Sequence, residues 1–499
     1  MINDCFQSGT VPSVFKQAIV KPLLKKQDLD PNKPSNYRPV SNLSFLSKLL
    51  EKLALQQMLE HVSKYDLFAR FQSAYRAHHS TETALLRVLN DLLVASDDSK
   101  VSILTLLDLS AAFDTIDHGI LLTRLRHVFG IDNVALSFLQ SYLSDRRQTV
   151  LIQGFVSEST PLKYGVPQGS VLGPLLFLLY TQPLPHVIDN HSVSHSEFAD
   201  NTQLYNSSHP SQIQTLLSTS EHCISDVKQW MTQTLLSASE HCISDVKQWM
   251  TQNKLQLNDS KTEALLVGGR GASDQAPKLT IGHSEITFSK SVRNLGVMFD
   301  DELSMRVHVN KVCQLAYYEL RKISTIRHYL SQQATQTLVT SLVLSRLDYG
   351  NSLLAGIPDT LLNKLQKVQN SAARLVFRCP KRTHTTPLLR ALHWLPIAQR
   401  IDYKLSSMCY NVFNQTAPHA LTEILTVYTP SRSLRSSADT KMLKVPRRNK
   451  KTQGQRAFSY IGPVTWNSLP LSVRDSDTPT QFKSSLKTHL FRSAFSADQ

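Results

Sequence analysis

The chain has 499 residues, 41% of them hydrophobic and 19% charged, a composition that excludes a disordered chain and provides material for about three domains. Lysine and arginine total 54 against 39 acidic residues, so the net charge of +15 predicts an anionic partner, nucleic acid before an acidic membrane surface. The six cysteines lack metal-ligand or disulfide spacing, and neither a signal peptide nor a membrane-spanning run is present, so we expect a reduced, intracellular protein without membrane contact, in the nucleus or the cytoplasm.

Basic side chains follow the first predicted strand. A short strand over 18–20 leads to Lys25, and Arg38 comes after a loop rich in proline and asparagine. Such cations beside a β-turn can bind a triphosphate, but they can equally form the solvated edge of a sheet. The spacing of the leucines that follow predicts an amphipathic helix over 43–64.

The stretch from Val101 to Arg126 is the one around which we expect the chain to be organised. Residues 101–107 form an apolar, β-compatible run that Asp108 follows directly, and helical spacing begins at Ala112. A strand that ends in a carboxylate holds that group rigidly, as metal-assisted chemistry requires. Asp108 can also be a simple N-cap of the next helix.

Two later turns carry further distinctive residues. The loop Gly165–Pro174 holds three glycines and two prolines before an apolar helix, and Gln168 lies within it. Such a loop lets main-chain N–H groups approach a substrate closely, or it is an ordinary structural turn. Ala199, Asp200 and Asn201 lie between two β-like runs, as in the tip of a hairpin. This hairpin can bring Asp200 beside the end of the earlier strand.

Four sequence strings, in this order, resemble successive motifs of reverse transcriptases, most closely those of LINE-like retrotransposons without long terminal repeats. They are YRPVSNLS, LLDLSAAFDTIDH, YGVPQGSVLGPLLFLLY and FADNTQLY, and the likeness extends over residues 15–305. The resemblance implies an α+β fold, a right-hand polymerase of fingers, palm and thumb with an antiparallel palm sheet and a helical C-terminal region. The implied parts are fingers and the start of the palm over 1–100, palm over 101–305, a helical thumb-like region over 306–425, and a basic linker with a small C-terminal cap over 426–499.

The same resemblance implies RNA-directed DNA polymerase activity, in which a nucleotide is transferred to a primer 3′-hydroxyl with two Mg²⁺ ions, or Mn²⁺ as a substitute. Asp108 and Asp200 would bind the metal ions, with the main-chain carbonyl of Leu109 and the side chain of Asn201 as further ligands. Lys261 would donate a proton to the departing pyrophosphate. The implied partners are an RNA template, a DNA primer and deoxynucleoside triphosphates, whereas the sequence does not determine the oligomeric state.

The other site residues implied by the resemblance contact the nucleotide or the primer. Phe113 would lie beneath the sugar of the incoming nucleotide, where an aromatic ring excludes a 2′-hydroxyl. The full set of nucleotide contacts is Lys25, Arg38, Phe113, Gln168 and Gly169. The set of primer contacts is Asn294, Leu295, Gly296 and Val297.

Two features depart from the family pattern. Asn201 stands where the family has aspartate, which removes one negative charge beside two dications, and the orientation of the neighbouring Glu197 is not determined by the sequence. Residues 215–233 recur as 234–252 with one difference, and 19 extra residues in one helix would rotate the next part of the chain by about 100°. We therefore expect 234–252 to occupy the original position and the first copy to bulge or to form an added helix.

These departures leave three interpretations open: an active polymerase, a catalytically inactive relic that binds RNA or an RNA–DNA hybrid, and a fragment that folds poorly because of the duplication. Residues 432–456 are rich in serine and basic side chains, which is typical of a mobile phosphate-binding segment or of a plain solvated linker. The fingers begin almost at the first residue, with no endonuclease or RNase H constellation, so we expect a truncated product.

Overall fold

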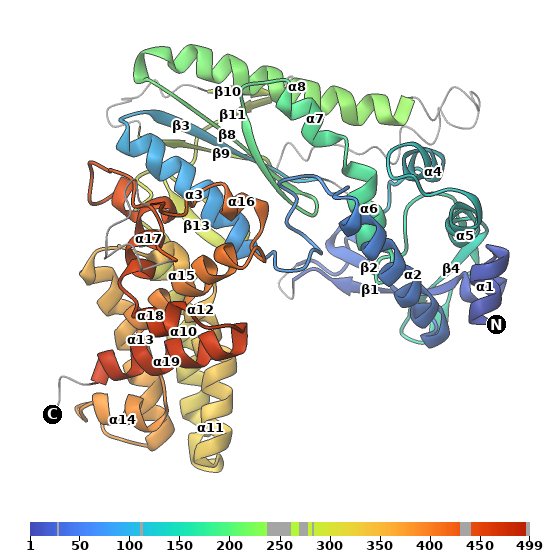
Figure 1. Ribbon diagram of the computed structural model, residues 1–499. Coiled ribbons are helices and arrows are strands. Elements are labelled where there is room, and N and C mark those ends of the chain that lie inside the picture. The colour runs from blue at the N-terminus through green and yellow to red at the C-terminus, as the bar shows by residue number, and fades with distance from the viewer. Residues whose placement is uncertain are drawn as a thin grey trace.

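The computed structural model describes residues 1–26, 29–109, 113–236, 261–268, 278–281, 284–429 and 441–495 (Figure 1). Mainly antiparallel sheets and helices are combined in the first three hundred residues, and helices follow in the described part of the chain, which confirms the predicted α+β class with a helical C-terminal region. No helix within these ranges combines the length and the apolar character that crossing a bilayer requires.

A four-stranded antiparallel sheet lies at the centre of the molecule, in the order β7-β8-β3-β9. Its strands are β3 (Val101–Leu107), β7 (Ser194–Phe198), β8 (Asn201–Ser208) and β9 (Glu263–Val267). Strand β3 is buried along almost its whole length because both faces of the sheet are covered. Leu104 packs in one core with α3 (Thr81–Asp97), whereas Ile103 and Leu107 pack in a second core with α8 (Ile213–Leu236) on the opposite face.

A second sheet lies on the N-terminal side, in the order β2-β1-β4-β5 with β6 paired to β4. Its strands are β1 (Gln17–Leu24), β2 (Tyr37–Asn42), β4 (Arg146–Ile152), β5 (Phe155–Val156) and β6 (Thr160–Leu162). Because β4 pairs in parallel with β1, the N-terminal layer is not confined to residues 1–100 as expected, and strands from 146–162 complete it.

Six helices join α8 in one apolar core around this sheet and the adjoining face of the central sheet. They are α1 (Ile2–Ser8), α2 (Phe45–Lys64), α4 (His118–His127), α5 (Asn133–Leu143), α6 (Gly173–Thr181) and α7 (Leu184–Asp189). The helix expected to begin near Ala112 begins instead at His118, because the side chain of Asp117 caps it by accepting a hydrogen bond from the N–H of Ile120 at 2.9 Å. Asp108 is therefore not the cap of this helix.

The first copy of the duplicated segment forms most of α8. Its apolar side chains Cys223, Ile224 and Val227 are fully buried against the central sheet. The expectation that this copy bulges or forms an added helix is therefore wrong, since it occupies a core position itself. Most of the second copy, residues 237–252, lies outside the described residues.

The C-terminal region is a set of helices that pack on α3 and on the β12–β13 hairpin, whereas the β10–β11 hairpin packs in the other core, which includes α8. The hairpin strands are β10 (Leu279–Ile281), β11 (Ser284–Ile286), β12 (Ser291–Asn294) and β13 (Val297–Asp300). The helices are α10 (Arg306–Ile326), α11 (Gln332–Val339), α12 (Ser345–Asp348), α13 (Asp359–Phe377), α14 (Thr386–Ala391), α15 (Ile397–Phe413), α16 (His419–Thr422), α17 (Phe458–Asn467), α18 (Leu471–Arg474) and α19 (Pro479–Phe495).

The end of the chain is not the separate small cap that was expected. Trp466 and Phe482 are fully buried in the same core as α10, α13 and α15, and the ring of Phe482 stacks on Tyr410 with centroids 4.1 Å apart. The last helices therefore belong to the helical region.

The second half of the basic segment 432–456 is likewise fixed rather than mobile. The main-chain N–H groups of Asn449 and Lys450 donate to the carboxylate of Asp97 at 3.1 and 2.7 Å. The guanidinium of Arg456 is buried and donates to the carbonyl of Leu303 at 2.8 Å. The expectation of a mobile linker is wrong for residues 441–456, because these contacts dock them on α3 and on the loop before α10.

Candidate active site

Two carboxylates meet at one end of the central sheet. Asp108 follows the last residue of β3, and the strand register pairs Leu107 with Thr202 on β8. The tight turn that joins β7 to β8 carries Asp200. Asp200 therefore lies beside the end of β3, in the arrangement that the hairpin pattern allowed.

Two basic side chains share this neighbourhood. The Nζ atom of Lys261 donates to Oδ2 of Asp108 at 2.9 Å. Burial raises the pKa of the Asp200 carboxyl above its ordinary value, and the charge of Asp108 raises it further, whereas a main-chain hydrogen bond and the positive charges of Lys261 and Arg38 lower it. The site thus combines two formal negative charges with two positive ones.

The third position of the turn adds no charge. The amide nitrogen of Asn201 donates to Oδ1 of Asp200 at 3.3 Å, and the side chain of Asn201 is exposed. Glu197 does not compensate, because its carboxylate is buried within the hairpin and is hydrogen-bonded to Nδ1 of His195. In the described part of the chain, no group of three or more acidic, histidine or cysteine side chains is arranged to hold a metal ion.

The chemistry of these donors fits a divalent cation with fewer charged ligands than the family pattern supplies. Asp108 and Asp200 offer the hard oxygen atoms that Mg²⁺ prefers, and Asn201 offers a neutral amide oxygen. The side chain of Leu109 is buried in the apolar core, so this residue has only its main-chain carbonyl to contribute. The expected ligand set is therefore compatible with a metal ion, but it has one negative charge fewer than the family pattern, which has aspartate at position 201.

The glycine-rich loop is joined to the segment after Asp108. The side-chain amide of Gln168 donates to both carboxylate oxygens of Asp114, at 3.1 and 3.0 Å, and the main-chain carbonyl of Gln168 accepts from the N–H of Ser41 at 2.7 Å. Gly169 has φ +107°, and a Cβ there would lie 2.9 Å from the carbonyl of Ser41, so only glycine fits this close approach. Phe113 is hydrogen-bonded to this loop, because its carbonyl accepts from the N–H of Val166 at 2.9 Å, and its ring centroid lies 5.0 Å from that of Phe177.

The two expected triphosphate contacts occupy different places on the β1–β2 hairpin. Arg38 pairs with Leu23 within the hairpin and is one of the charges that act on Asp200. Lys25 follows the last strand residue of β1, where its N–H donates to the carbonyl of Asn36 at 2.8 Å. Of the two, Arg38 is the one whose charge lowers the pKa of the Asp200 carboxyl.

The four residues expected at the primer form the tip of the β12–β13 hairpin. The amide of Asn294 is buried and donates to Oε1 of Gln203 at 2.8 Å, and Val297 is fully buried. Leu295 and Gly296 form the turn itself, with φ +42° and +89°. Of the turn residues, Gly296 is exposed and Leu295 is half-buried against the helical core, whereas Asn294 and Val297 anchor the hairpin.

Three site-supporting residues were missed by sequence reasoning. Asp114 orients Gln168, Gln72 contacts the turn before Asp200, and Tyr349 donates through its hydroxyl to the carbonyl of Leu295 at 2.7 Å. Each contact joins residues more than 50 positions apart in the chain. No local pattern in the sequence signals such pairs.

Comparison with known proteins gives a family match over the region that holds this site. The family model described as reverse transcriptase (RNA-dependent DNA polymerase) matches residues 24–299. The chain is 24% identical over 400 residues to the RNA-directed DNA polymerase from mobile element jockey of Drosophila melanogaster, over 79% of this chain and 41% of that protein. It is 25% identical over 408 residues to the probable RNA-directed DNA polymerase from transposon BS of the same organism, over 78% of this chain and 41% of that protein.

The chain thus spans about two fifths of the length of these curated relatives. Among solved structures, it is similar to apo telomerase from Candida tropicalis truncated from the C-terminal domain, with a TM-score of 0.37 and 14% identity, over 58% of this chain and 54% of that one.

Proposed function

The chain belongs to the reverse transcriptase (RNA-dependent DNA polymerase) family, and from this premise we propose that it extends a DNA primer on an RNA template, as the polymerase of a retrotransposon without long terminal repeats. The observation that supports this activity is the meeting of Asp108, at the end of β3, with Asp200, on the β7–β8 turn, beside Lys261. Paired carboxylates on rigid strand ends are suited to metal-assisted phosphoryl transfer.

We assign the family's parts to three regions of the structure. The central sheet with α3 and α8 is the palm, the β1–β2–β4 sheet with its helices is the fingers, and the helical region from residue 306 is the thumb. Residues 441–495 are part of the thumb core, because their aromatic side chains are buried there.

Each site residue has a role that its position supports. Asp108, Asp200 and the carbonyl of Leu109 would hold divalent ions, which reverse transcriptases as a family use. Bound Mg²⁺, or Mn²⁺ in its place, supplies Lewis-acid activation of the primer 3′-hydroxyl and neutralises charge on the leaving pyrophosphate. Lys261 holds a proton beside Asp108 that it can give to the pyrophosphate, and its Nζ atom must leave Oδ2 of Asp108 when a cation binds there.

The nucleotide is bound and selected by residues of three segments. Arg38 binds the triphosphate, since it is the fingers cation whose charge acts on Asp200. Gln168, held by Asp114, and the exposed Gly169 contact the nucleotide and the template. Phe113 excludes a 2′-hydroxyl from the sugar, which selects deoxynucleotides.

The primer end is held by the main chain of Leu295 and Gly296, because Asn294 and Val297 are buried. The hydroxyl of Tyr349 fixes this turn from the thumb side.

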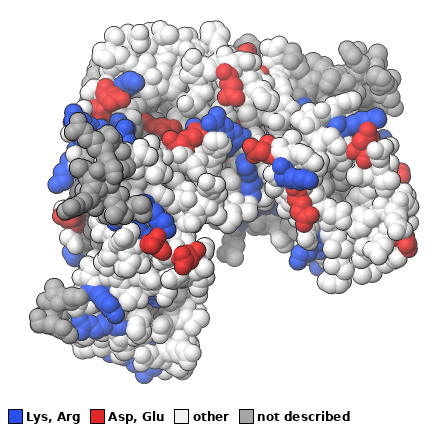
Figure 2. Space-filling model, in the orientation of Figure 1, with Lys and Arg blue, Asp and Glu red and all other residues white. Residues whose placement is uncertain are grey.

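A second function, an inactive relic that binds RNA or an RNA–DNA hybrid, is favoured by one observation. Asn201 is neutral, so the formal charge of the site is the sum of two carboxylates and two cations, which is zero. Little net negative charge therefore remains to concentrate a dication near Asp108, Asp200, Lys261 and Arg38. The excess of basic residues would still bind phosphates, with a steep dependence on salt. Figure 2 shows lysine and arginine side chains, with acidic ones among them, near the hollow between the N-terminal layer and the helical region.

Primer extension on a poly(A)–oligo(dT) template, with Mg²⁺ and with Mn²⁺, separates the two functions. Incorporation that is lost in Asp108→Ala supports the polymerase, and binding of the template–primer without incorporation supports the relic. Incorporation that survives Asp108→Ala would contradict the assignment of the site.

A further inference from the structure

The turn that carries Asp200 is held by one side chain from a distant part of the chain. Oε1 of Gln72 accepts from the N–H of Ala199 at 3.1 Å, and its Nε2 donates to the carbonyl of Ala199 at 3.4 Å. The same Oε1 also accepts from the N–H of Ala74 at 3.0 Å. Gln72 is buried, with 6% of its surface exposed, so these hydrogen bonds are sheltered from water.

Main-chain hydrogen bonds hold the segment that presents Gln72. The N–H of Ser73 donates to the carbonyl of Glu197 at 2.9 Å, and the N–H of Glu197 donates to the carbonyl of Phe71 at 3.2 Å. Residues 71–73 therefore run along the free edge of β7, and this main-chain contact ends at Glu197. The side chain of Gln72 extends the attachment two residues further, to Ala199, which directly precedes Asp200.

Ala199 needs such support because of its backbone conformation. Its φ is +57°, in the left-handed region that residues with a Cβ rarely adopt without a stabilising contact. An amide that binds both the N–H and the carbonyl of Ala199 fixes the orientation of the peptide groups on either side of it. The direction in which Asp200 leaves the turn is set by these peptide groups.

We propose that Gln72 is a positioning residue that holds Asp200 in the orientation needed to bind a divalent ion beside Asp108. This inference rests on the proposed function and adds to it a residue that contacts neither substrate nor metal. Only a side chain with one donor and one acceptor at this reach serves both groups of Ala199. Glutamate lacks the donor, and asparagine is one methylene group too short.

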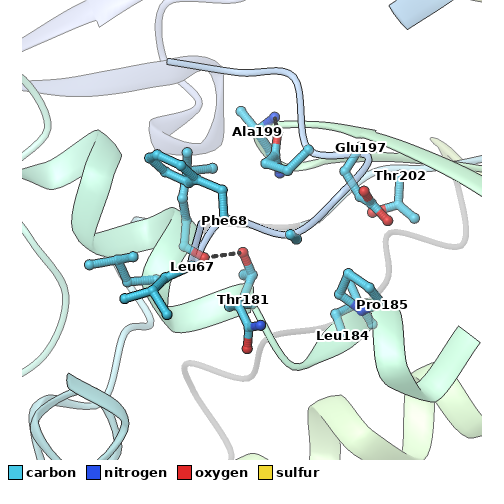
Figure 3. A pocket seen from close by; sticks show the side chains of 13 residues that line it. Leu67, Phe68, Thr181, Leu184, Pro185, Glu197, Ala199 and Thr202 are labelled. Atoms are coloured by element: carbon cyan, nitrogen blue, oxygen red, sulfur yellow. Dashed lines mark hydrogen bonds between the residues drawn. The ribbon is translucent and has the colours of Figure 1, made fainter. Parts of the chain in front are cut away.

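A pocket beside Gln72 allows a small molecule from solution to take the place of the Gln72 side-chain amide when that side chain is removed. Gln72, Glu197 and Ala199 line it, and it is partly open to solvent. Figure 3 shows Ala199 and Glu197 on one side of this pocket, with Leu184 and Pro185 across from them. In Gln72→Ala, a small primary amide such as acetamide can enter the space that the removed side chain vacates and reach the main chain of Ala199.

The test compares Gln72→Ala and Gln72→Glu with Gln369→Ala, all in the full chain carrying Asn201→Asp. Gln369 is a matched control because it is also a buried amide, which donates to the carbonyl of Leu395 at 2.9 Å but lies in the thumb. Mn²⁺ binding is measured by electron paramagnetic resonance, with Asp108→Ala to identify the site, and primer extension and melting temperature are measured alongside.

Both Gln72 variants should bind Mn²⁺ about 10-fold more weakly and lose kcat by a similar factor, with little change in the KM for nucleotide. Acetamide should restore binding in Gln72→Ala, whereas N,N-dimethylacetamide, which has no N–H group, should not. Gln369→Ala should lose melting temperature and keep its Mn²⁺ affinity.

Unchanged Mn²⁺ affinity in Gln72→Ala would overturn the proposal, as would an equal loss in Gln369→Ala or Mn²⁺ binding that does not depend on Asp108. The binding measurement does not require polymerase activity. If Mn²⁺ binding depends on Asp108 and on Gln72 but the chain extends no primer, the result contradicts the proposed function and supports the positioning role of Gln72.

Discussion

Asn201→Asp is the substitution with the largest expected effect on activity. The change adds a carboxylate next to Asp200, since the amide nitrogen of Asn201 now lies 3.3 Å from Oδ1 of that residue. The formal charge of Asp108, Asp200, Lys261 and Arg38 sums to zero, and the substitution lowers it to −1. The variant should therefore bind divalent ions more tightly than the natural chain.

The size of the effect is given by Coulomb's law. A unit charge 4 Å from a monovalent ion contributes about 1 kcal/mol in water, and twice that for a divalent ion. A gain of about 2 kcal/mol corresponds to an affinity about 30-fold higher. The exposed side chain of Asn201 justifies the dielectric constant of water, which makes this value a lower bound.

The assay is the Mg²⁺ dependence of primer extension. Half-saturation should move to a Mg²⁺ concentration about 30-fold lower in Asn201→Asp. Asn190→Asp is a suitable control, because it adds the same charge at an exposed position before β7, at the opposite end from the turn. Equal Mg²⁺ dependence in the natural chain and Asn201→Asp would refute the electrostatic argument, and an equal shift in Asn190→Asp would assign the gain to net charge alone.

Three further predictions concern the loop, the hairpin and the thumb core. Asp114→Asn should raise the KM for dTTP about 5-fold, because Gln168 loses a charged acceptor worth about 1 kcal/mol at this exposed place, and an unchanged KM in steady-state kinetics would contradict that role. Although burial lowers the pKa of His195, hydrogen bonds that the ring donates to carboxylates, Glu197 above all, raise it overall. The contribution of His195 to stability is therefore complete below the ordinary value of 6.5 and is lost as pH rises through the raised value. The urea midpoint of the natural chain should therefore fall as pH rises over this range, and His195→Gln should remove that fall. A fall of the same size in the variant would exclude His195 as its source. Trp466→Ala should lower the free energy of unfolding by about 3–5 kcal/mol, measured by urea denaturation, and a loss typical of a surface site would show that the last helices are a separate cap.

Local signals were sufficient where an element depends on its own residues. The strand 101–107, the carboxylate that follows it and the hairpin around Asp200 could be predicted because alternation, apolar runs and turn residues act over a few positions. The start of α4 was predicted wrongly because helical spacing near Ala112 was weighed above the capping chemistry of Asp117. The strands β4 to β6 were assigned to the wrong layer because pairing between β1 and β4 joins residues over 100 positions apart.

The duplicated segment shows most clearly what a sequence leaves open. Two nearly identical copies have the same helical propensity and the same apolar face, so no local argument can decide which one is buried on the sheet. In the structure, the first copy packs there, because it follows β8 directly and α8 can fold back on that strand.

The sequence by itself determined the chemical groups available to this protein and the short elements that carry them: Asp108 at a strand end, Asp200 in a turn, and Asn201 in place of a charge. The tertiary structure alone decided that Gln72 supports the turn of Asp200, that Asp114 holds Gln168, and that Glu197 faces the interior. The physical reason is that local conformation depends on neighbours in the chain, whereas these contacts exist only once two apolar cores have brought distant segments together.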